Sequence, residues 1–112
     1  MGKTMKIAEQ FSDTSEMELA VFDRSILMHH TMDDAALATE VLALFEAQLQ
    51  RLERLDWAKL DLPFEMHTLR GAAAAVGATQ LQSIADKGNP DSGDFETEVK
   101  AAIKMFRAKI LN

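Results

Sequence analysis

Apolar residues recur every three or four positions along most of this chain, which is the spacing of one face of an α-helix. The longest such stretch follows Asp33 and Asp34, whose carboxylates suit a helix N-terminus, and it continues through Asp56. Its predicted inward positions are Leu37, Val41, Leu44, Phe45, Leu49, Leu52 and Leu55. The alternating pattern typical of β-strands does not occur. The pattern therefore predicts an all-α fold.

Three further helices are predicted after this one. The first starts at Asp61-Leu62-Pro63, where proline is tolerated in the first turn, and ends or bends at Gly77, because glycine costs about 1 kcal/mol inside a helix. A short helix over residues 79–87 and a last helix from about Asp94 follow, separated by the breaker-rich segment 88–93. Their inward positions are Leu62, Met66, Leu69, Ala73, Val76, Leu81, Ile84, Phe95, Val99, Ile103, Phe106 and Ile110. Short connections between amphipathic helices indicate an antiparallel up-down four-helix bundle.

The N-terminal part predicts one or two short additional helices ahead of the bundle. Residues 1–20 carry a weak helical pattern and are expected to form a short helix or an arm. Asp23 is a candidate N-cap for a short helix that contains Leu27 and ends near Met32. The bundle domain is accordingly assigned to residues 21–112.

Composition narrows the possible partners. The chain has 112 residues, enough for one domain with one core. Its net charge of −6 disfavours nucleic acid, which needs a basic surface. The absence of cysteine excludes disulfides, thiolate metal sites and a cysteine nucleophile. Without a membrane-length apolar run or a signal-like start, we expect a cytoplasmic monomer with neither membrane nor nucleic-acid partners.

The segment around His67 is the candidate functional site. Helical neighbours lie three and four residues apart, so Arg70 and Gly71 flank His67 on its own face. That face lies opposite the apolar stripe, and His67 is predicted to point towards solvent. Gly71 and Ala74 would leave a low platform around the ring, although alanine is also simply the best helix former. The exposed imidazole of His67 has a positive charge next to it in Arg70 and no side chain next to it at Gly71. This arrangement is suited to binding a large anionic partner.

With these positions in view, the segment resembles the histidine-containing phosphotransfer (HPt) domain family. Members carry His-x-Leu-Lys-Gly, two small residues, two variable residues, an apolar residue and Gly-Ala-x-x-Leu on the third helix of a bundle. The matching positions are His67, Leu69, Gly71, Ala72, Val76, Gly77, Ala78 and Leu81. Arg70 replaces the commoner lysine, which keeps the charge and changes its geometry. The family often continues its fourth helix through Cys-x-x-Leu-Glu, whereas this chain has Ala85-Asp86-Lys87-Gly88 and should end that helix early.

The resemblance implies a phosphoryl carrier. His67 would accept a phosphoryl group from an aspartate of a receiver domain and pass it to a second receiver, Arg70 would offset the phosphoryl charge, and Gly71 would give the partner's loop access. The implied partners are receiver domains of response regulators or of a hybrid histidine kinase. The receiver would supply Mg²⁺, so this chain would need no cofactor. It carries no glycine-rich nucleotide-binding loop and is not expected to be an enzyme in its own right.

Other interpretations stay open. The same Gly/Ala surface could serve a helical interaction module that docks proteins without phosphotransfer. His29 and His30 fit the C-terminal end of a short helix, where positive charge is favoured; adjacent histidines on a helix cannot both face one ion, so no metal site is expected. Phe64 and Met28 are candidates for an apolar patch that a receiver would contact.

Overall fold

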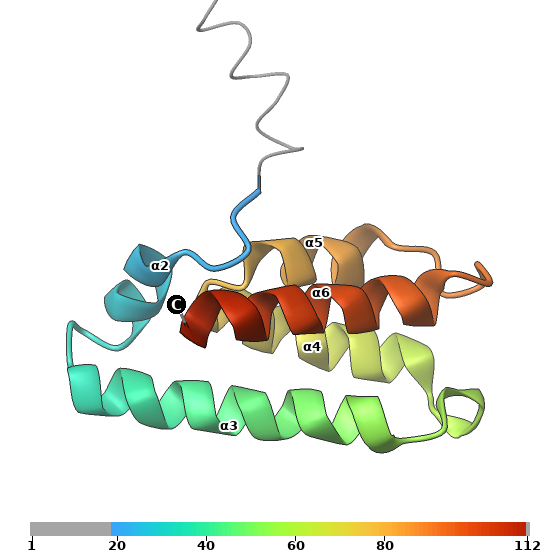
Figure 1. The fold of residues 1–112 in the computed structure, drawn as a ribbon, viewed down its shortest axis with the longest axis horizontal. Coiled ribbons are helices and arrows are strands. Elements are labelled where there is room, and N and C mark those ends of the chain that lie inside the picture. The colour runs from blue at the N-terminus through green and yellow to red at the C-terminus, as the bar shows by residue number, and fades with distance from the viewer. Residues whose placement is uncertain (1–18, 112) are drawn as a thin grey trace, which may run out of the picture.

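The computed structural model describes residues 19–111, and this part of the chain is entirely helical (Figure 1). Its elements are α2 (Arg24–His30), α3 (Ala35–Arg54), the 3₁₀ turn η1 (Trp57–Lys59), α4 (Leu62–Val76), α5 (Thr79–Lys87) and α6 (Phe95–Leu111). The all-α prediction is confirmed for these residues, and α5 has the predicted bounds. The helix or arm predicted within residues 1–20 lies almost wholly outside the described residues.

Aspartates start the first three of these helices and the 3₁₀ turn. The Asp23, Asp34 and Asp61 carboxylates accept hydrogen bonds from the backbone N–H groups of Ser25, Leu37 and Phe64. Each satisfies an amide that has no partner within its own helix. Asp33 does not cap α3; it lies in the preceding turn with a left-handed φ of 59°. The helix starts predicted from local sequence are therefore correct to within a residue or two.

The core lies between α4 and the helices packed around it. Its fully buried large side chains come from every α-helix described: Leu27, Leu49, Leu52, Leu69, Val76, Leu81, Phe95, Val99 and Ile103. Phe106 of α6 meets Phe45 of α3 edge-on, with ring centroids 5.3 Å apart. Helices α3, α4, α5 and α6 run alternately in opposite directions across Figure 1. Burial of one stripe from each helix accounts for the periodic pattern of the sequence.

Two positions predicted to face inward do not. Leu44 is 73% exposed, and Leu55 is 36% exposed just beyond the end of α3. Phe45 takes the inward direction at this level, and a neighbouring helical residue is turned by about 100° from it. The set of inward positions predicted for α3 was therefore too broad. Only those residues of α3 that contact another helix become buried.

Trp57 closes the connection between α3 and α4. It forms η1, where its ring is buried, its Nε1–H donates to the Leu52 carbonyl at 2.8 Å, and its ring meets Phe95 at 6.2 Å. Helix α3 therefore ends at Arg54 rather than at the predicted Asp56. The buried indole needs its hydrogen-bond partner, and the turn supplies it.

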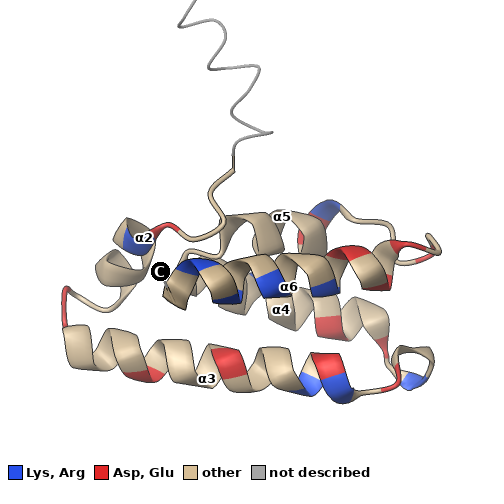
Figure 2. Ribbon diagram, in the orientation of Figure 1, with Lys and Arg blue, Asp and Glu red and all other residues tan. Residues whose placement is uncertain are grey.

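Ion pairs connect α3 to both neighbouring long helices. Arg107 of α6 binds Glu46 at 2.9 Å and Glu53 at 3.0 Å, and Arg51 of α3 binds Glu65 of α4 at 2.7 Å. Figure 2 shows the matching basic segments on α6 and acidic segments on α3. The guanidinium groups of Arg107 and Arg51 hold the pKa values of Glu53 and Glu65, respectively, below their ordinary range.

Candidate functional site

Helix α4 places His67 on its solvent side. Met66 and Leu69 on either side in sequence are buried, whereas His67 itself is exposed. Since the buried neighbours fix the rotation of the helix, the imidazole projects away from the core. The predicted orientation of His67 is confirmed.

Arg70 lies beside His67 and is already engaged. Its Nη2 is 3.4 Å from His67 Nδ1, and its Nη1 donates a hydrogen bond to Asp86 Oδ1 at 3.0 Å. Arg70 and Asp86 are both partly exposed, at 44% and 43%. The predicted neighbours His67 and Arg70 are thus brought together, and a carboxylate from α5 joins them.

A shallow pocket of about 250 Å³ opens next to the imidazole. Its walls come from α4, from the end of α5 and from the segment after it: Pro63, Met66, His67, Arg70, Ala85, Asp86, Gly88 and Pro90. Gly88 is held against Ile84 and the Phe95 ring, which brings the chain after α5 up to this pocket. The early end of α5 therefore shapes the space beside His67.

Gly71, one turn after His67 on the same helix, faces open space. A Cβ atom built at this position would meet no heavy atom within 4 Å. Glycine in a helix interior costs about 1 kcal/mol relative to alanine, and no contact within the described chain requires it. The open space is available to whatever approaches His67.

The other histidines lie away from this cluster. His29 and His30 form the exposed last turn of α2, as predicted, and His30 Nδ1 lies 3.0 Å from the Ala75 carbonyl near the end of α4. Within residues 19–111, no group of three or more histidine, aspartate or glutamate side chains gathers as a metal site would require.

The two candidates for an apolar contact patch differ. Phe64, one turn before His67, is 61% exposed, whereas Met28 is partly buried and packs against the core. Leu44, predicted to be buried, instead borders a shallow groove of about 230 Å³ between α3 and α4, together with Ala72 and Ala75. Phe64 and Leu44 are therefore exposed apolar side chains, while Met28 contributes mainly to packing.

Sequence reasoning missed Asp86 as a site residue. The sequence marks it only as part of the segment where α5 ends early. Finding its contact with Arg70 requires the register of α5 against α4, which local periodicity does not contain. The only sequence signal for this contact was that Asp86 carries a charge opposite to that of Arg70 and lies on the next helix of the chain.

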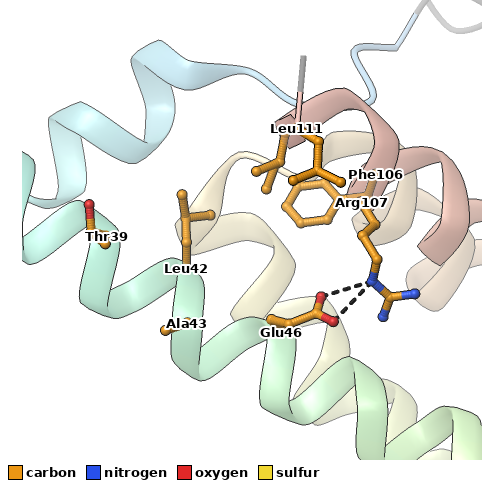
Figure 3. Close-up of a pocket in the computed structure, with 8 residues that line it drawn as sticks. Thr39, Leu42, Ala43, Glu46, Phe106, Arg107 and Leu111 are labelled. Atoms are coloured by element: carbon orange, nitrogen blue, oxygen red, sulfur yellow. Dashed lines mark hydrogen bonds and ion pairs between the residues drawn. The ribbon is translucent and has the colours of Figure 1, made fainter.

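A larger cavity, of about 480 Å³, lies elsewhere, between α3 and α6 (Figure 3). Leu42, Phe106 and Leu111 give it an apolar lining, and Glu46 is bound there by Arg107. It shares no lining residue with the pocket beside His67. The two charged side chains that line this cavity, Glu46 and Arg107, are paired with each other.

Within the described residues, no helix is both long and apolar enough to cross a lipid bilayer. Comparison with known proteins adds no relative: no family model matches the chain, no curated protein matches it, and no solved structure matches it.

Proposed function

We propose that this chain is a histidine phosphotransfer protein of a cytoplasmic multistep phosphorelay, carrying a phosphoryl group on His67 between receiver-domain aspartates. The observation that carries the proposal is the exposed imidazole with Arg70 Nη2 at 3.4 Å and open space above Gly71. Phosphoryl transfer demands mainly positioning and neutralisation of oxygen charge. These residues can supply both.

The transfer step uses the lone pair of an unprotonated ring nitrogen. That nitrogen attacks the phosphorus of an aspartyl phosphate on the receiver, and the N–P bond forms as the P–O bond to the aspartate breaks. The bonding electrons leave with the carboxylate, and the ring keeps the hydrogen on its other nitrogen. The reverse step, with a second receiver, passes the group on. Mg²⁺ belongs to the receiver on this proposal, and the chain acts as a carrier rather than an enzyme.

The helix arrangement supports this function. We infer that α3 to α6 form an up-down four-helix bundle, which agrees with their alternating directions in Figure 1 and their shared core. A rigid bundle holds α4 so that His67 stays exposed for a partner's acidic pocket. Phe64, one turn before His67 and 61% exposed, offers an apolar contact near the imidazole, and Leu44, 73% exposed, offers another at the groove between α3 and α4.

The decisive test is labelling by a phosphorylated receiver. A panel of receiver domains carrying aspartyl phosphate should label the wild-type chain with an acid-labile phosphoryl group, and His67→Gln should abolish the label. His29→Gln, which alters another exposed histidine, should keep it. Circular dichroism checks that each variant is helical. Binding of receivers to the wild-type chain without any label would instead favour a docking module that performs no transfer.

A further inference from the structure

Asp86 makes a contact that fold stability does not explain. Its carboxylate accepts a hydrogen bond from Arg70 Nη1 at 3.0 Å, while Nη2 of the same guanidinium is 3.4 Å from His67 Nδ1. Both charged side chains are more than two-fifths exposed, and exposed ion pairs contribute little to stability. Arg70 is shared between the imidazole and Asp86, with its shorter contact to Asp86.

Phosphorylation of His67 would change the partners available to Arg70. A phosphoryl group brings strong acceptor oxygens and close to two negative charges next to the guanidinium. Arg70 cannot keep its full interaction with Asp86 while binding those oxygens. Its interaction with Asp86 is therefore weaker in the phosphorylated chain than in the free chain.

We propose that Asp86 is a positioning residue that competes with the phosphoryl group for Arg70. This proposal rests on the proposed function, and it assigns to that site a device that keeps the N–P bond weak enough for onward transfer. Before phosphorylation, Asp86 holds the guanidinium close to the ring at the edge of the pocket beside His67. Afterwards, the weakening of the Arg70–Asp86 pair raises the free energy of the phosphorylated chain.

The test needs a phosphoryl donor that works without a partner protein. In phosphoramidate, imidazole attack forms the N–P bond of phosphohistidine while the bond from phosphorus to the amine breaks and ammonia is released. At fixed phosphoramidate and ammonium concentrations, the ratio of phosphorylated to free His67 therefore reports the stability of the N–P bond. Phosphorus NMR measures the ratio, and mass spectrometry confirms that His67 carries the group.

We expect Asp86→Asn to raise this ratio about three- to tenfold at low ionic strength, and less in high salt. Asp86→Glu, which keeps the charge, should restore a ratio close to that of the wild-type chain. In an Arg70→Gln background, Asp86→Asn should change the ratio by less than about twofold, because there is no guanidinium left to compete for. The Nη and Nε signals of Arg70 should also shift on phosphorylation in the wild-type chain.

Two outcomes would overturn the proposal. The first is a ratio of phosphorylated to free His67 that Asp86→Asn leaves unchanged. The second is an equal effect of Asp86→Asn in the wild-type and Arg70→Gln backgrounds, which would mean that Asp86 acts only through its charge and not through Arg70. Neither outcome depends on receivers: if no receiver labels the chain, the proposed function fails while the phosphoramidate ratios still test the competition. If receivers do label it, return of the group from Asp86→Asn to a receiver should be slowed by a similar factor.

Discussion

Two glycines of one helical segment are present for different physical reasons. Gly77 ends α4 with a left-handed φ of 84°, and a Cβ atom there would collide with the Asp23 carbonyl. Gly71 lies within α4, where a Cβ atom would meet nothing. The fold requires the first glycine and only tolerates the second, so the reason for Gly71 is to be sought outside the chain.

Replacing Gly71 separates stability from transfer. Gly71→Ala should stabilise the chain by about 0.5–1 kcal/mol, because alanine loses less backbone entropy in a helix. Gly71→Gln should remain folded and yet slow phosphotransfer, because its side chain fills the space beside His67. Urea unfolding and the time course of labelling by a receiver measure the two effects. Transfer by Gly71→Gln at the wild-type rate would contradict the access role.

At the scale of elements, the end of α4 is where several segments meet. The Gly77 carbonyl accepts a hydrogen bond from the Asp23 backbone N–H at 2.7 Å, directly before α2. The Ala78 backbone N–H donates to the Ala73 carbonyl at 2.9 Å, and α5 starts at the next residue. This close approach connects α2, α4 and α5, and it leaves no room for a side chain at residue 77.

Gly77→Ala should therefore be strongly destabilising. We expect a loss of about 2–4 kcal/mol, from the left-handed backbone and the contact with Asp23. Gly93→Ala is the matched control, because a Cβ atom at Gly93 meets nothing within 4 Å, and its effect should be small. Urea denaturation followed by circular dichroism compares the two. Equal stabilities for both variants would mean that α2 moves away from α4 at little cost.

At the scale of the whole molecule, charged pairs couple the long helices. Arg107 joins α6 to two glutamates of α3, and Arg51 joins α3 to α4. In the folded chain the pKa values of Glu53 and Glu65 are lowered, chiefly by hydrogen bonds from these arginines. As the solution becomes acidic, the unfolded chain therefore binds more protons than the folded chain. The free energy of unfolding must then decrease as the pH is lowered.

The acid dependence can be assigned to one of these pairs. The Glu53 contribution is complete above its ordinary pKa of 4.5 and is lost as pH falls through the lowered folded value. Glu53→Gln should cost about 1 kcal/mol at pH 7, and the difference from the wild-type chain should shrink below about pH 4. Glu40→Gln, at an exposed position of the same helix, serves as the control. Urea unfolding from pH 3 to pH 7 measures both; a constant difference for Glu53→Gln would contradict the assignment.

Sequence alone was sufficient for the features that depend on near neighbours. The all-helical class and the outward direction of His67 follow from the 3.6-residue period of the α-helix. Local hydrogen bonding accounts for the end of α4 at Gly77 and for the helix caps at Asp23, Asp34 and Asp61. These interactions lie within one or two turns of chain. The role proposed for His67 also comes from the sequence pattern, through its resemblance to a family.

Tertiary structure decided the features that depend on which helices meet. Leu44 is exposed because Phe45 takes the inward direction at that level of α3, and Trp57 is buried because Phe95, from the distant α6, packs against its ring. Asp86 reaches Arg70 only through the register of α5 on α4. Such contacts join residues far apart in the chain, and helical periodicity gives a direction around each axis without naming the neighbour that lies there.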